Sequence, residues 1–133
     1  MDDLLAWSDV VAVHAPVTDE TIGLIDARRL SLLRDGCALL NTAREAVLDS
    51  EALERELSSG RIRAALDVFE HEPLPQGSLL WSLPNVILTP HIGARTLDSR
   101  RAQGRIVVEE IERYVRGEPL LYEIRLEDYD SLA

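Results

Sequence analysis

Short, continuous runs of apolar residues recur along this chain, and segments with helical spacing lie between them. Each run is three or four residues long and ends at a polar residue or a proline. Continuous apolar runs are typical of strands that are buried on both faces of a parallel sheet, because a strand with one wet face alternates apolar and polar residues. We expect four such strands, at residues Val10–Val13, Ala38–Leu40, Ala64–Leu66 and Val86–Leu88.

Two short helices are expected between these strands. Asp26 can cap the first, and Gly36 can end it, since glycine accommodates the left-handed residue that follows many helices. Asp49 or Ser50 can cap the second, which Gly60 closes. The apolar residues of both segments recur at helical spacing: Leu30, Leu33, Leu53 and Leu57.

A longer helix is expected to begin near Asp98 and to end at Gly117 and Pro119. We assign residues 1–119 to one domain, and residues 120–133 to an acidic tail that connects to a segment of another domain. The tail is weakly patterned, so we expect it to be loosely held or to pack on a segment that these residues lack. The helix carries an apolar stripe: Val107, Val108, Ile111, Tyr114 and Val115.

Strand–helix–strand order with short connections predicts an α/β fold. We expect part of a Rossmann-type, doubly wound parallel sheet with flanking helices and right-handed crossovers. Ligands of such sheets bind at the carboxyl ends of the strands. The unusual polar residues of this chain gather at those ends, which predicts a site on one rim of the sheet: His14–Pro16, Thr42–Arg44, Asp67 with Glu70–Pro73, and His91–Gly93.

Charge and composition exclude several kinds of function. The 14 Lys+Arg and 24 Asp+Glu residues leave a net charge of −10, which repels nucleic-acid phosphates. No apolar run approaches the ~20 residues that cross a bilayer, and the acidic start is unlike a signal peptide. The single cysteine, Cys37, lies among apolar residues and is expected to be buried. We therefore expect a cytoplasmic protein with no membrane partner, no nucleic-acid partner and no metal site.

Four segments stand out by their order and spacing: Ser8–Thr18, Leu40–Arg44, Ala65–Pro73 and Pro84–Gly93. Together they resemble the D-isomer-specific 2-hydroxyacid dehydrogenase family, which includes phosphoglycerate, glycerate and formate dehydrogenases. The resemblance covers most of the chain, and it implies that these residues form the carboxyl-terminal half of the family's NAD-binding domain.

The resemblance implies that Arg44, Glu72 and His91 are catalytic. Arg44 matches the arginine that binds the carboxylate of a 2-oxo acid through its guanidinium fork. His91 matches the residue that gives a proton to the carbonyl oxygen and removes it in the reverse direction, for which imidazole is suited near neutral pH. Glu72 matches the carboxylate that orients His91 and favours its protonated form. Glu70 is a rival for that role, and we prefer Glu72 because it precedes a proline, as in the family pattern.

The resemblance also implies that the chain binds NAD or NADP. Asp67 matches the residue that accepts a hydrogen bond from the nicotinamide carboxamide. His14 is expected to line the cofactor cleft, whereas His71 is expected to be exposed. The remaining residues expected to contact the cofactor are Ala15, Pro16, Thr42, Ala43, Arg44, His91, Gly93 and Ala94.

The sequence departs from the family pattern in three ways. Arg44 is followed by Glu45 and Ala46 where the family has glycines, so the loop could differ and Glu45 could compete for the charge of Arg44. Arg95 stands where a small residue is usual. No Gly-x-Gly-x-x-Gly occurs in these 133 residues, although the cofactor's pyrophosphate binds such a loop at a helix amino terminus.

These features predict the portion of an oxidoreductase that transfers a hydride between NAD(P) and a small 2-hydroxy or 2-oxo acid, and we expect it to be a fragment that is inactive alone. The strand at Val10–Val13 would form an exposed apolar edge of the sheet. We therefore expect a homodimer, or association with an amino-terminal half that is missing here. The alternative is a non-catalytic, NAD-responsive interaction module, since corepressors resembling this family carry the same residues. A further alternative is a remnant that self-associates.

Overall fold

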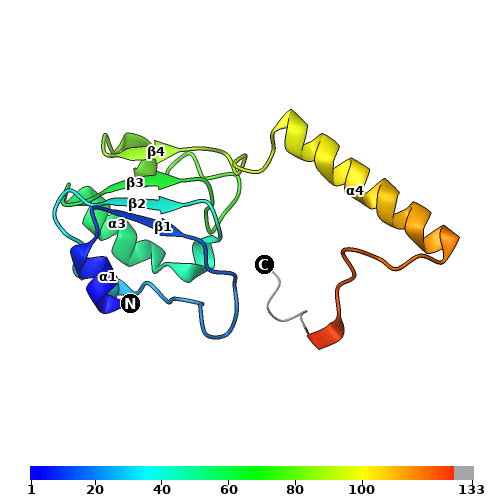
Figure 1. Cartoon of the computed structure of the whole chain (residues 1–133). Coiled ribbons are helices and arrows are strands. Elements are labelled where there is room, and N and C mark those ends of the chain that lie inside the picture. Colours follow the sequence, from blue (N-terminus) through cyan, green and yellow to red (C-terminus); the bar gives the residue numbers. More distant parts are fainter. Residues whose placement is uncertain (128–133) are drawn as a thin grey trace. The chain divides into compact units, whose positions relative to one another are not determined.

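The structure, a computed structural model, describes residues 1–127. The chain divides into two compact units: one is Met1–His91, and the other begins at Ile92 (Figure 1). This division concerns packing within the chain, and the domain boundary expected after residue 119 stays a prediction. The last part of the expected tail, residues 128–133, lies outside the described residues.

Four strands form one parallel sheet in the first unit: β1 (Val10–Val13), β2 (Ala38–Asn41), β3 (Arg63–Leu66) and β4 (Val86–Leu88). Their order across the sheet is β1-β2-β3-β4, so neighbours in sequence are also neighbours in space (Figure 1). All four expected strands are present, and the α/β class is confirmed. Two strands are one residue longer than expected, because Asn41 and Arg63 join the ladder of backbone hydrogen bonds.

Helices connect these strands and precede them. The expected helices are α2 (Ala27–Ser31) and α3 (Ser50–Ser58). Three further elements were not predicted, since each is only one or two turns long and has little periodic pattern. They are the helix α1 (Asp2–Trp7) and the 3-10 helices η1 (Glu45–Val47) and η2 (Leu79–Ser82).

Aspartate side chains cap the two connecting helices at their amino ends. Asp26 accepts a 2.8 Å hydrogen bond from the backbone N–H of Arg29, and Asp49 accepts one of 2.9 Å from Ala52. Asp49, rather than Ser50, is therefore the cap of α3. α2 ends at Ser31, before the expected stop, and a turn joins it to Gly36. Gly36 and Gly60 have φ of 80° and 75°, which glycine adopts without strain.

The strands are buried on one face of the sheet, so the expectation of burial on both faces is wrong for this unit. Leu39 in β2 is 0% exposed, whereas Val10 in β1 and Ile87 in β4 are 59% and 67% exposed. The strand order explains the difference. Right-handed crossovers between strands that advance in one direction all lie on the same face. Accordingly α2 contacts both α1 and α3, and α1 and α3 lie on one side of the sheet in Figure 1.

The covered face of the sheet and its helices form a single hydrophobic core. Cys37 belongs to this core and is 1% exposed, as expected of a small hydrophobe. Asn41 is buried at the same level, although its side chain is polar. The largest side chains that are completely buried are Leu5, Leu30, Leu39, Leu57, Ile62, Val47, Asn41 and Cys37.

The second unit is dominated by the long helix α4 (Leu97–Arg116). Its cap is Thr96, whose hydroxyl accepts a 3.1 Å hydrogen bond from the Ser99 N–H, so the helix begins slightly before the expected position. Gly117 ends it with a φ of 67°, as expected. No residue of α4 is buried, and its apolar stripe is exposed. Within residues 1–127, no helix combines the length and apolar character needed to cross a bilayer.

Substitutions on opposite faces of β2 test the burial on one face. Leu39→Ala removes a buried side chain and should lower the free energy of unfolding by about 2–4 kcal/mol. The matched change Leu40→Ala lies on the open face and should cost about 1 kcal/mol or less. Urea unfolding of the chain, followed by circular dichroism, measures both. Equal losses would contradict a sheet that is covered on one face.

The buried thiol predicts a loss of stability at alkaline pH. Burial raises the pKa of the Cys37 thiol above its ordinary value of 9.0. The unfolded chain therefore releases this proton at a lower pH than the folded chain. The contribution of the protonated Cys37 thiol to the free energy of unfolding is complete below about pH 9. It falls as the pH rises through the pKa of this thiol in the folded chain. Urea unfolding from pH 7 to 11 should show this fall in the native chain and a smaller one in Cys37→Ala. The same fall in both proteins would refute the assignment.

Candidate functional site

The register of the sheet places the ends of the four strands in one row. Val13 pairs with Asn41, Asn41 with Leu66, and Leu66 with Leu88. Each is the last residue of its strand, and the strands are parallel. The residues that follow them therefore emerge on a single rim of the sheet. This arrangement confirms that the polar residues of the first unit that were singled out in the sequence share one edge.

His91 and Glu72 contact each other on this rim. His91 follows β4, and Glu72 lies in the loop after β3. Glu72 Oε2 is 2.7 Å from His91 Nδ1, and both side chains are a little over one-third exposed. A carboxylate only accepts hydrogen bonds, so Nδ1 is the donor. Nε2 is then the ring nitrogen that can exchange a proton with a ligand.

Each residue of this pair also makes a hydrogen bond within its own segment. His91 has a φ of 51°, in the left-handed region, and its N–H donates a 3.0 Å hydrogen bond to the Thr89 carbonyl. A residue other than glycine in this region costs about 1–3 kcal/mol and persists where its surroundings hold it. Glu72 Oε1 accepts a 3.2 Å hydrogen bond from the Phe69 N–H. Both partners of the pair are therefore held by their own segments.

Asp67 links the ends of β2, β3 and β4. Its backbone N–H donates to the Asn41 carbonyl at 3.0 Å, and its Oδ1 accepts a 2.5 Å hydrogen bond from the Thr89 hydroxyl. Thr89 in turn donates its own N–H to Leu66. Asp67 is 3% exposed, so it is more deeply buried than a simple cap of a turn. Its expected contact with a nicotinamide carboxamide stays a prediction.

Arg44 lies on the same rim, after β2, and its side chain is exposed. Its Nη1 donates a 2.8 Å hydrogen bond to the Ala43 carbonyl. Glu45 was a potential competitor for this charge, but its carboxylate accepts a hydrogen bond from Ser50 instead. Across residues 1–127, no ion pair joins Arg44 to a carboxylate, so its guanidinium is not neutralised within this part of the chain.

Asn41 holds the loop that carries Arg44, and this role was not predicted. Its Nδ2 donates to the Arg44 carbonyl at 2.9 Å, and its Oδ1 accepts from the Ala43 N–H at 3.1 Å. A signal was present in the sequence. Asparagine at the end of a strand readily bonds the backbone two residues later and so starts a turn.

The other residues expected at the cofactor differ in their surroundings. Ala15 and Ala43 pack partly against the core, and the Pro16 carbonyl accepts a 2.5 Å hydrogen bond from Thr21. Thr42 and His14 are exposed on the rim. The Ala94 carbonyl accepts from Ser99 near the start of α4. Gly93, Ala94 and Arg95 belong to the second unit.

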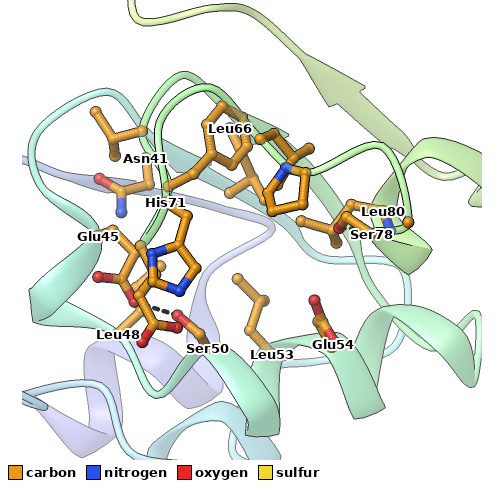
Figure 2. A pocket seen from close by; sticks show the side chains of 16 residues that line it. Asn41, Glu45, Leu48, Ser50, Leu53, Glu54, Leu66, His71, Ser78 and Leu80 are labelled. Atoms are coloured by element: carbon orange, nitrogen blue, oxygen red, sulfur yellow. Dashed lines mark hydrogen bonds between the residues drawn. The ribbon is translucent and has the colours of Figure 1, made fainter.

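A pocket of about 320 Å³ lies under the loops that follow β2 and β3 (Figure 2). Asn41 and Glu45 line it next to the Arg44 loop, and Glu70 and His71 line it next to Glu72. The pocket is therefore next to the loops that carry Arg44 and Glu72, and none of the three candidate catalytic residues lines it. Within residues 1–127 no cluster of His, Cys, Asp and Glu could hold a metal ion.

The contact between Glu72 and His91 can be tested on the chain itself. Removing the acceptor in Glu72→Ala should shift the neutral His91 ring from the Nδ1–H form towards the mixture of tautomers of a free imidazole. Glu70→Ala is the matched control, since Glu70 is exposed and lies two residues earlier. Nitrogen-15 NMR of the ring measures the tautomers. An equal effect of both substitutions would reject the pairing.

Curated relatives match this chain over most of its length. It is 42% identical over 119 residues to a glyoxylate reductase from Thermofilum pendens, which covers 89% of this chain and 35% of that protein. It is 43% identical over 115 residues to a hydroxypyruvate reductase from Thermotoga maritima, covering 84% and 37%. It is also 40% identical over 126 residues to a D-3-phosphoglycerate dehydrogenase from Archaeoglobus fulgidus, and this alignment covers 94% of this chain and 24% of that protein. The chain thus spans well under half the length of these relatives.

Solved structures are similar to this chain in both sequence and fold. A D-isomer specific 2-hydroxyacid dehydrogenase from Xanthobacter autotrophicus Py2, in complex with NADPH and MES, is 44% identical with a TM-score of 0.80, covering 93% of this chain and 51% of that one. A D-lactate dehydrogenase from Treponema pallidum is 36% identical with a TM-score of 0.80, covering 94% and 42%. The family model for the D-isomer specific 2-hydroxyacid dehydrogenase NAD binding domain matches residues 1–93. This chain therefore belongs to the D-isomer specific 2-hydroxyacid dehydrogenase family.

Proposed function

We propose that this chain carries the acid–base and carboxylate-binding residues of an NAD(P)-dependent oxidoreductase that interconverts a small 2-hydroxy acid and its 2-oxo acid. The observation that supports this most strongly is the 2.7 Å hydrogen bond between Glu72 and His91. It joins two residues from different loops at the ligand-binding rim. A histidine oriented in this way has one ring nitrogen fixed and the other ready for proton exchange.

Each of the three residues has a distinct task in this proposal. His91 Nε2 gives a proton to the carbonyl oxygen of the 2-oxo acid during reduction and removes it from the hydroxyl group during oxidation. Glu72 holds the ring and stabilises its positive charge. Arg44 binds the substrate carboxylate, for which an exposed guanidinium that makes no ion pair with the carboxylates of residues 1–127 is suited. The nicotinamide cofactor supplies or accepts the hydride when it is bound.

The residues at the rim fit the nicotinamide end of the cofactor. The small side chains of Ala15 and Ala43 lie directly beyond β1 and β2, where a flat ring requires close approach to the backbone. These 133 residues contain no glycine-rich phosphate loop, so the pyrophosphate requires residues from outside them. We propose that an amino-terminal half of the family's type, a second copy of the chain, or both complete the site. NAD and NADP are equally compatible with the residues present.

The names of the relatives suggest which substrates to test. Glyoxylate and hydroxypyruvate are the 2-oxo acids in the names of two of them. The test uses the chain extended to family length with the remaining segments of the Thermotoga maritima hydroxypyruvate reductase. Oxidation of NADH or NADPH is then followed by the loss of absorbance with each 2-oxo acid. An NAD-responsive binding module without catalysis predicts cofactor binding and no turnover, which would overturn the proposal.

Substitution of the acid–base residue should separate chemistry from binding. His91→Gln should lower kcat by at least about 100-fold, because the reaction loses its proton donor. The cofactor affinity, measured by NADH fluorescence, should change by less than about twofold, since the ring acts on the substrate oxygen. His71→Gln is the matched control and should leave kcat unchanged. Retention of turnover in His91→Gln would remove this residue from the acid–base role.

A further inference from the structure

Asn41 occupies an unusual position for an uncharged polar side chain. It is the last residue of β2, in the middle of the sheet, and it is 1% exposed. Its backbone pairs with Val13 on one side and Leu66 on the other, so its main chain is held between two neighbouring strands. A buried amide must satisfy its hydrogen bonds locally, because leaving them unmade costs about 1–3 kcal/mol.

Both ends of this amide bond the backbone of the Arg44 loop. Oδ1 accepts from the Ala43 N–H at 3.1 Å, and Nδ2 donates to the Arg44 carbonyl at 2.9 Å. A single side chain thus joins the rigid end of β2 to the two peptide groups around Arg44. Asparagine supplies a donor and an acceptor at this length, whereas aspartate lacks the donor, leucine lacks both, and the single hydroxyl of serine is too short to reach both peptide groups. In Figure 2 the Asn41 side chain lies beside Glu45, the residue after Arg44.

The residue that Asn41 holds has few other restraints. Arg44 is extended, with φ of −145° and ψ of 141°, and its exposed side chain bonds only to the preceding carbonyl among the described contacts. The loop beyond it is tied down separately, because Glu45 bonds Ser50. The direction in which the guanidinium leaves the sheet therefore depends on the backbone that Asn41 fixes.

We propose that Asn41 is a positioning residue that aims the Arg44 guanidinium at the carboxylate of the substrate. The inference rests on the proposed function, since it assigns that carboxylate to Arg44. Recognition by a guanidinium fork requires alignment of two parallel hydrogen bonds, so a rotation of the supporting peptide weakens it. Asn41 itself does not touch the substrate. Its effect passes through Arg44 and should disappear when Arg44 is removed.

The first measurement uses the full chain and needs no activity. Asn41→Leu removes both hydrogen bonds and keeps the same number and branching of side-chain heavy atoms. Hydrogen exchange of the Ala43 N–H, followed by NMR, should accelerate by at least about tenfold, the factor expected for loss of one hydrogen bond. Asn85→Leu is the matched control, since Asn85 Nδ2 donates to Leu57 and Ile62 at 2.9 and 2.7 Å, near the opposite end of the sheet. Unchanged exchange in Asn41→Leu would overturn the anchoring contact.

The second measurement uses the family-length enzyme described above. Asn41→Leu should raise the KM for the 2-oxo acid by about tenfold, the cost of one misaligned hydrogen bond, and leave the KM for NADH within about twofold. In an Arg44→Ala background the same substitution should have no further effect on the substrate KM, because its target is gone. Asn85→Leu should alter neither KM in either background. Thermal melting of each variant identifies losses that are due to unfolding.

The outcomes separate this inference from the proposed function. If the parent enzyme turns over but Asn41→Leu and Arg44→Ala act additively, Asn41 is a structural residue and the positioning role is overturned. If the parent enzyme has no turnover, the proposed function fails and the role fails with it.

Asn41→Ser provides a second test in case Asn41→Leu does not fold. Its hydroxyl can accept from Ala43 but is too short to reach the Arg44 carbonyl, so the KM effect should persist with less loss of stability.

Discussion

The parallel register of the four strands is the constraint on which the rest of the structure depends. Val13, Asn41, Leu66 and Leu88 form its last row, and every residue of the candidate site follows one of them or lies in the next loop. A shift of one residue in any strand would move its core side chain to the open face and displace the polar residue at its end. Burial of Leu39 and Leu66 on the covered face opposes such a shift. Core packing therefore positions the site.

Hydrogen bonds at the strand ends extend this order into the loops. Asn41 bonds the Arg44 loop, Asp67 bonds both Asn41 and Thr89, and the Thr89 carbonyl receives the His91 N–H. Asn41 and Asp67 are buried, so each of these polar side chains must find a partner within reach. The result is a connected set of contacts across β2, β3 and β4. It holds the segments of Arg44 and His91 relative to the same sheet, while their side chains remain accessible.

Several apolar surfaces away from these strand-end contacts are exposed among the described residues. One face of the sheet is uncovered in the first unit, and β1 is an edge strand. The α4 stripe is exposed as well. Exposed apolar faces and edges of this kind are usually covered in stable proteins. They are compatible with the proposal that further segments or a second copy complete the enzyme, and the relatives are longer than this chain.

The sequence by itself determined the strands, the caps and the candidate residues. Apolar runs, Asp26, Asp49 and the order of four motifs are local signals, and local signals need no knowledge of packing. Only the tertiary structure decided that helices cover one face, that the Glu72 carboxylate meets His91 Nδ1 at 2.7 Å, and that Asn41 bonds the Arg44 loop. The first of these facts depends on the direction of the crossovers. The second depends on a side-chain contact between residues 19 positions apart in sequence, and the third on hydrogen bonds within a buried turn. A pattern along the chain carries no information about such directions in space, because they are set when the strands pair and the core closes.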